Sequence, residues 1–313
     1  MNKNRLLLGL LVLVVVLAAI AWFEPTRVVR GRLAGEAFFE GRPTSYWSKS
    51  LRNEDPLARQ ETLAALKKGA ADANPVLIEL LGETTPPSEE AIEIRWTAGD
   101  LLGQQKEKAA AATPALARAL TDSDAHVRSV AAKALGQIGP AAKASVPQLL
   151  PMLTTEDRLD AMKALAGIGP EALPAQEQLI ALLEHQDDKI RWQASRVLGK
   201  IGPAAAGAVP ALIAKLKDKD DEVREHVAEA LGQIGPSAPK AREAILALTE
   251  TLKDANPKVR RDAVRSLGQM GPTARAALPE VKKLTADSAP PVRDAAARTI
   301  RLIEGTAEKK ATP

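Results

Sequence analysis

The residues AKALGQIGP, Ala132–Pro140, contain the pattern from which the fold of this chain is predicted. The pattern returns as VLGKIGP at 197–203, ALGQIGP at 230–236 and SLGQMGP at 266–272, with a weaker copy, ALAGIGP, at 164–170. Self-similarity at a spacing of 30 to 36 residues is typical of stacked supersecondary units. We therefore predict a repeat array in which each unit covers the apolar face of its neighbour.

An arginine stands at the same position of every unit. The intervals between these arginines are 36, 33, 30, 33, 33, 36 and 33 residues. An aspartate four residues upstream of several of them suits a helix N-cap. We interpret the set as a structural ladder; the alternative is a row of anion-binding arginines. The ladder consists of Arg59, Arg95, Arg128, Arg158, Arg191, Arg224, Arg260 and Arg293.

Each unit is predicted to contain two helices. Ile190, Ala194, Leu198 and Ile201 fall on one helical face and give the buried stripe of a first helix. Gly-Pro then ends this helix, because Gly can adopt the left-handed conformation and Pro cannot continue the helix. A second helix begins near the next proline, where the missing N–H has no intrahelical acceptor anyway. The predicted fold is all-α, a right-handed α-solenoid of about eight helix pairs.

The repeating unit combines Asp-x-x-Val-Arg, an Ala-rich helix, LGxIGP and a Val-Pro before an apolar helix. This combination resembles bacterial HEAT repeats of the short type also seen in phycobilin-lyase relatives. The resemblance covers Asp55 to about Gly305. Two copies depart from the pattern: one has Gln104-Gln105-Lys106 in place of Ile-Gly-Pro, and another has Asp157 in place of Val. A kink, a loosened interface or a contact site is expected there.

The domain organisation follows from these boundaries. Residues 44–305 are predicted to form the solenoid, with 44–54 as an N-terminal cap helix in which Trp47 covers the first repeat. Residues 24–43 are predicted to be a juxtamembrane linker, partly helical around Leu33–Phe39, and 306–313 a disordered tail.

The N-terminal segment, residues 1–23, is predicted to be a transmembrane or signal-anchor helix. Leu6–Phe23 contains no charge over 18 residues, which is long enough to span a membrane. Trp22-Phe23 suits the membrane interface, and a short charged N-terminus favours a body outside the cytoplasm, on the periplasmic side. Ala19-Ile20-Ala21 leaves open a cleaved signal peptide and a secreted or periplasmic chain.

Charge and composition argue against several functions. The net charge of +4 comes from the ends of the chain, because residues 44–305 contain 35 basic and 35 acidic residues. A nucleic-acid surface needs clustered excess Lys and Arg, so no nucleic-acid partner is predicted. The absence of cysteine excludes disulfides and thiolate chemistry. His126, His185 and His226 lie at non-equivalent repeat positions, and no metal, cofactor or catalytic residue is predicted.

Repeat arrays offer a long surface whose common use is protein binding. We therefore expect a non-enzymatic, membrane-tethered scaffold that binds a protein or extended peptide along the second helices. The resemblance implies a lyase-like or enzyme-accessory protein as the alternative, and a nucleic-acid-binding protein is a lower one. The candidate partner-binding residues are Lys215, Lys217, Arg242, Lys282 and Lys283.

Overall fold

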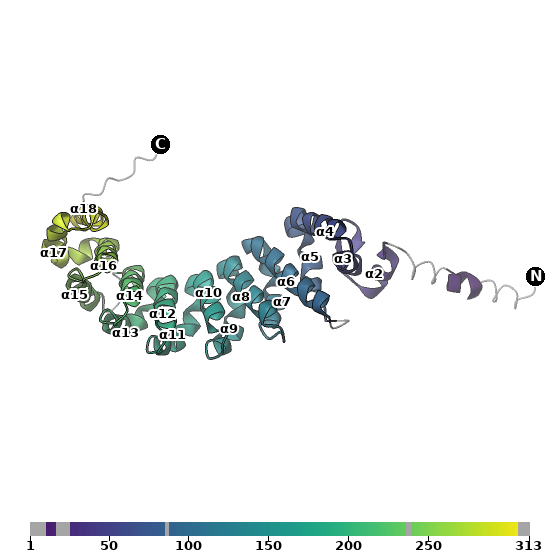
Figure 1. The fold of residues 1–313 in the computed structure, drawn as a ribbon, viewed down its shortest axis with the longest axis horizontal. Helices are drawn as coiled ribbons and strands as arrows, with labels where there is room; N and C mark the ends of the chain where they lie inside the picture. The colour runs from purple at the N-terminus through teal and green to yellow at the C-terminus, as the bar shows by residue number, and fades with distance from the viewer. Residues whose placement is uncertain (1–10, 17–25, 85–87, 236–239, 306–313) are drawn as a thin grey trace, which may run out of the picture. The chain divides into compact units, whose positions relative to one another are not determined.

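The computed structural model describes residues 11–16, 26–84, 88–235 and 240–305. The chain divides into two compact units, Met1–Ile138 and Gly139–Pro313. Both units are built from successive helices, joined within most repeats by short 3-10 segments (Figure 1).

The repeats alternate between a first helix, which carries the ladder arginine, and a second helix. The first helices are α4 (Pro56–Gly69), α6 (Glu89–Gln104), α8 (Ala125–Ile138), α10 (Arg158–Ile168), α12 (Asp188–Ile201), α14 (Asp221–Ile234), α16 (Pro257–Gln269) and α18 (Pro290–Glu304). The second helices are α5 (Asn74–Leu81), α7 (Thr113–Ala119), α9 (Val146–Met152), α11 (Gln176–Leu182), α13 (Val209–Lys215), α15 (Ala241–Thr251) and α17 (Leu278–Lys283). The described residues thus contain seven helix pairs and a final single helix, where about eight pairs were predicted.

In six of the seven described pairs, the connection is a 3-10 helix rather than a simple break. These helices are η1 (Ala70–Ala73), η2 (Lys106–Ala112), η3 (Gly139–Ser145), η4 (Gly169–Ala175), η5 (Gly202–Ala208) and η6 (Gly271–Ala277), and a further one, η7 (Leu284–Ala286), follows α17. At the start of the first helices, aspartate caps form where predicted. Asp187 accepts from the N–H of Lys189 at 2.9 Å, and Asp220 from that of Val223 at 3.0 Å.

The second glycine of LGxIGP ends the first helix with a positive φ, as at Gly202 (72°) and Gly235 (81°). Two repeats lack this glycine, yet their backbone makes the same turn. Ala70 and Lys106 take its place with φ of 47° and 53°. A residue with a Cβ in this region is strained by about 1–3 kcal/mol. The turn is therefore imposed by the packing of the helix pair and persists against local preference.

The first glycine of the motif has a different role, which the sequence did not reveal. A Cβ at Gly232 would lie 2.7 Å from the Cβ of Ser266, and one at Gly199 would lie 2.9 Å from the Cα of Ala230. Neighbouring first helices approach closely at these points. In the Gly139–Pro313 unit, they form one row, and the second helices α11, α13, α15 and α17 form another (Figure 1). Within this unit the first helices α10, α12, α14, α16 and α18 pack extensively on one another, whereas α13 and α15 meet at few residues.

The segment before the repeats is more ordered than a linker. It contains α2 (Val28–Ala34) and an antiparallel hairpin of β1 (Phe38–Phe39) and β2 (Arg42–Pro43). The prediction of helix around Leu33–Phe39 is therefore wrong, because Gly35 ends α2 and the chain then turns into β1. The cap helix, α3 (Thr44–Leu51), follows directly and is shorter than the predicted 44–54.

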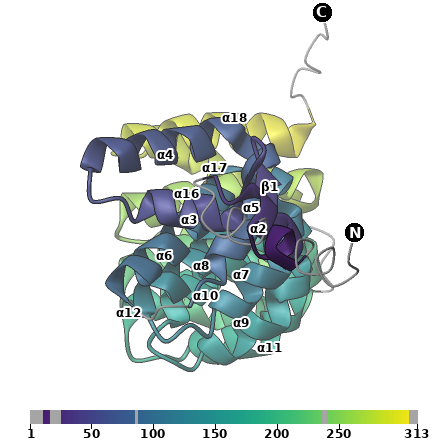
Figure 2. The ribbon, with the colours of Figure 1, turned by 90° about the vertical axis from the view of Figure 1, so that its right-hand side faces the viewer.

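Trp47 of α3 joins the hairpin to the first repeat. Its side chain is buried, and its indole N–H donates to the carbonyls of Phe39 and Arg42 at 3.3 and 3.2 Å. Figure 2 shows β1 beside α5, and β1 contacts that helix. The hairpin and α3 thus cover the apolar end of the first pair.

Of the predicted membrane segment Leu6–Phe23, only residues 11–16 are described; they are helical and exposed. The remainder, like the predicted tail 306–313, lies outside the described residues. Among described residues, one stretch is long and apolar enough to span a membrane by length and composition, Asp188–Lys215, with a mean hydropathy of 1.5 in its most apolar window. This stretch comprises α12, η5 and α13, one helix pair of the array.

Candidate functional site

Four arginines of the ladder form ion pairs that are largely buried. The guanidinium of Arg191 donates two hydrogen bonds, from Nε and Nη2, to the carboxylate of Asp218, both at 2.9 Å. The side chains are 5% and 7% exposed. The same bidentate geometry joins three further pairs at 2.8–3.1 Å: Arg95–Asp122, Arg224–Asp254 and Arg260–Asp287.

The third donor of each arginine ties the ladder to the backbone. Nη1 of Arg224 donates to the carbonyls of Asp218 and Lys219 at 2.9 and 3.3 Å. Asp218 therefore binds Arg191 through its carboxylate and Arg224 through its main chain. Arg59, Arg128 and Arg293 make similar bonds to the turn before their own helices. In each of these cases the ladder arginine binds a carbonyl of this same chain.

The acidic partner is a different aspartate from the helix cap. It stands six residues before the next ladder arginine, and the cap stands four before it. Burial alone opposes ionisation of Asp218, but the hydrogen bonds from Arg191 and the N–H of Asp220 outweigh it, so the pKa of Asp218 is lowered. The hydrogen bond to Asp218 in turn raises the pKa of Arg191. Both groups stay charged at neutral pH.

One joint of the ladder uses histidine instead of aspartate. His185 follows Arg158 by the same 27 residues that separate Arg191 from Asp218, and its Nε2 lies 3.0 Å from Nη1 of Arg158. Its Nδ1 faces the N–H of Asp187 at 3.0 Å. Both partners are donors, and a neutral imidazole accepts at only one nitrogen. This joint is therefore weaker than the carboxylate joints, in the repeat whose sequence departs from the pattern.

The predicted partner-binding residues do not form one patch. Lys215 is paired with Glu184 at 2.7 Å, Lys282 with Glu304 at 2.9 Å and Lys283 with Glu280 at 2.6 Å. Arg242 is exposed on α15. Lys217, which lies two residues after the end of α13, lines a groove.

This groove, between α13 and α15, has a volume of about 290 Å³. Apart from Lys217, its residues were not among the predicted ones, because α15 contributes residues that follow no repeat-wide pattern. Glu250 and Lys253 line it, and the exposed Leu246 continues the same helical stripe toward the start of α15. The lining combines aliphatic side chains with charges of both signs: Ile213, Leu216, Lys217, Ala247, Glu250, Thr251, Lys253 and Asp254.

The first-helix face of the same unit carries charged side chains that bind one another. Arg261 contacts Glu225 at 3.0 Å and Asp262 at 2.7 Å. Burial, with the nearby Asp262 charge, raises the pKa of Glu225. His226 stacks on Trp192 with ring centroids 4.9 Å apart. These polar side chains bind one another and stabilise the row of first helices. The first-helix face therefore has fewer unpaired charges available to a partner than the groove has.

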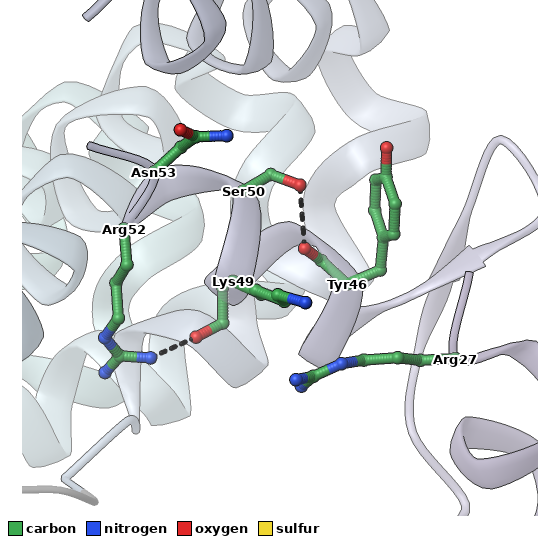
Figure 3. Close-up of a pocket in the computed structure, with 7 residues that line it drawn as sticks. Arg27, Tyr46, Lys49, Ser50, Arg52 and Asn53 are labelled. Carbon is green, nitrogen blue, oxygen red and sulfur yellow. Dashed lines mark hydrogen bonds between the residues drawn. The ribbon is translucent and has the colours of Figure 1, made fainter. Parts of the chain in front are cut away.

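A second hollow lies in the Met1–Ile138 unit, beside α3. It is lined by residues of α3 and the turn after it, together with Arg27 (Figure 3). Within the described residues, no group of three or more His, Asp or Glu side chains is placed to hold a metal ion.

Comparison with known proteins agrees with this architecture. No curated protein sequence matches the chain. An engineered protein from a structural genomics consortium is 24% identical, with a TM-score of 0.54 over 83% of this chain and 78% of that one. A mutant of Kap121p and importin beta in an ammonium sulfate condition are each 16% identical, with TM-scores of 0.59. They align over 83% and 86% of this chain, which spans 33% and 42% of theirs.

These structural likenesses show the fold alone, a HEAT- and importin-like helical solenoid. The family model for HEAT repeats matches residues 86–169, 176–251 and 245–312, more than half of the chain. The predicted resemblance to HEAT repeats is thereby confirmed, and the chain belongs to the HEAT-repeat family.

Proposed function

We propose that this protein is a non-enzymatic, membrane-tethered scaffold that binds an extended protein segment in the groove between α13 and α15. HEAT-repeat solenoids typically serve as protein-interaction scaffolds. The observation that carries the proposal is the composition of the groove. Ile213, Leu216 and Ala247 offer an apolar surface, and Lys217 and Lys253 stand beside it.

The charges of the groove define the expected partner. Asp254 is neutralised by Arg224, so Lys217 and Lys253 outnumber Glu250. A peptide with an apolar side chain next to an acidic one would satisfy both features. Apolar burial supplies affinity, at about 25 cal/mol per Å², and charge complementarity supplies orientation and speed of association.

The test is selection from a random-peptide library against the purified chain. We expect enriched peptides that combine an apolar and an acidic residue and that lose at least tenfold in affinity for the double variant Lys217→Glu, Lys253→Glu. Lys189→Glu, an exposed lysine on α12, is the matched control. Enriched peptides that bind the groove variant and the wild type equally well would refute this site.

The tether and its orientation are part of the same proposal. Leu6–Phe23 serves as an uncleaved anchor with the repeats on the periplasmic side; cleavage after Ala21 is the alternative. The chain has no cysteine, so the single variant Ser288→Cys gives an unambiguous label at an exposed position. Labelling by a membrane-impermeant maleimide in cells with a permeabilised outer membrane supports the orientation, and labelling only after lysis contradicts it.

The intact mass separates the two processing alternatives. An anchored chain starts at Met1, and a processed one at Trp22. The lyase-like and nucleic-acid functions stay predictions from the sequence, and no contact among the described residues favours either.

A further inference from the structure

The hollow beside α3 has a volume of about 520 Å³ and is lined only by polar and basic residues. Its lining consists of Arg27, Tyr46, Ser48, Lys49, Ser50, Arg52 and Asn53. Three of these seven side chains are cationic and none is acidic. Figure 3 shows Lys49 and Arg52 extending from α3 while Arg27 reaches toward α3 from the segment before α2.

The positive charge of this pocket is only partly compensated. Arg52 contacts the carboxylate of Glu83 at 2.6 Å. Arg27 donates from Nη1 to the main-chain carbonyl of Ser45 at 3.1 Å, which does not neutralise it. Neither Arg27 nor Lys49 has an ion pair among the described residues. Two positive charges therefore face the pocket without an acidic partner.

Arg52 adds unused hydrogen-bond donors. Its Nη1 is engaged by Glu83 and by Ser48, but its Nε and Nη2 are buried and have no acceptor in the described part of the chain. An unpaired buried donor costs about 1–3 kcal/mol, and more when the group is charged. Both atoms are closed to solvent, so Arg52 contributes positive charge beside the pocket and not a hydrogen bond to a ligand.

The backbone at Arg27 is also held in an unfavourable conformation. Arg27 caps α2 with φ of 57° and ψ of 13°, the left-handed region. This conformation is costly for a residue with a side chain. Here it accompanies the hydrogen bond that directs the guanidinium to α3. A strained residue that presents a charge to a pocket is characteristic of a binding site.

We propose that this pocket binds the phosphate group of a small molecule or lipid head group. A phosphate provides several acceptor oxygens and one to two negative charges, and it matches the two cations that lack an acidic partner, Arg27 and Lys49. Asn53 and Tyr46 supply neutral contacts for the group attached to the phosphate. The proposal concerns the Met1–Ile138 unit and does not depend on the groove between α13 and α15.

The experiment is calorimetric titration of the full chain in uncharged detergent micelles. One arm uses inorganic phosphate, and the other uses the same micelles doped with phosphatidylglycerol, with diacylglycerol, which has no phosphate, as the lipid control. Lys49 is exposed and makes no ion pair within the described residues, so Lys49→Gln is expected to fold normally. Lys49→Arg is the conservative variant, and Lys108→Gln, an exposed lysine elsewhere in the same unit, is the matched control.

We expect the wild type to bind and Lys49→Gln to bind about tenfold more weakly, since one charge-assisted contact is lost. Lys49→Arg and Lys108→Gln should bind like the wild type. Binding of inorganic phosphate identifies a free phosphate compound as the ligand class, and binding confined to phosphatidylglycerol identifies a head group. No heat in either arm at millimolar ligand, or equal binding by wild type and Lys49→Gln, would overturn the proposal.

Discussion

Removal of one carboxylate of the ladder, in Asp218→Ala, tests the physical account of the repeat joints. The substitution leaves Nε and Nη2 of Arg191 without acceptors, although that side chain is only 5% exposed. It also frees the N–H of Asp220, which donates to the same carboxylate at 3.0 Å. Breaking a buried pair by removing one partner costs about 3–5 kcal/mol, because a charge is left buried and unpaired.

The loss of stability should be confined to the repeats next to Asp218. Each repeat contacts only its neighbours, so unfolding of an array need not be all-or-none. We therefore expect amide protons of α12 and α14 to exchange faster by at least about 100-fold, which corresponds to about 3 kcal/mol. The measurement is hydrogen exchange with mass spectrometry. Peptides from α6 should be unchanged.

Two further variants calibrate the result. Asp218→Asn keeps one acceptor and should lie between the alanine variant and the wild type. Lys133→Ala breaks an exposed pair with Asp100, in which the lysine is 59% exposed, and should cost no more than about 1 kcal/mol. If Asp218→Ala accelerates exchange in α12 and α14 by less than fivefold, or no more than Lys133→Ala does in α8, the ladder does not hold the repeats together as argued.

Further predictions follow from the same contacts. The pKa values of Asp218, Asp254 and Asp287 are lowered, so these carboxylates stabilise the folded chain above the ordinary pKa of 3.8, and this stabilisation is lost as pH falls below that value. The urea midpoint of the wild type should therefore fall more steeply below pH 3.8 than that of Asp218→Asn. Parallel curves for the two proteins would contradict this. His185→Asp supplies the missing carboxylate to Arg158 and should stabilise by about 1–2 kcal/mol, seen as slower exchange in α10 and α12; unaltered or faster exchange would show that the histidine joint is not the weak one. Ala70→Gly and Lys106→Gly should each raise stability by about 1 kcal/mol through relief of a positive φ, and Gly232→Ala should lower it by about 1–3 kcal/mol through its clash with Ser266; thermal melts that rank these variants otherwise would refute the two roles assigned to the motif's glycines.

The sequence by itself determined the repeat unit, because the signals that define it are local. The 3.6-residue spacing of Ile190, Ala194, Leu198 and Ile201 gives a first helix, and all four side chains are buried. Gly202 and Pro203 give its end, and Asp187 its start. Each of these signals acts within a few residues of the chain, so one copy of the pattern is sufficient to predict the first helix and its two ends.

The tertiary structure decided which residues meet across neighbouring repeats. Asp218 and Asp220 lie in the same turn, and the sequence does not distinguish the partner of Arg191 from the helix cap; only the packing of α12 on α14 brings Asp218 to the guanidinium. The same holds for the positive φ at Lys106, where the local sequence predicts no turn of this kind. The candidate sites depend on packing as well, since the groove and the basic pocket join residues from separate elements that share no pattern. Periodic interactions repeat in the sequence and can be read from it, whereas a binding surface is formed where the repeats differ.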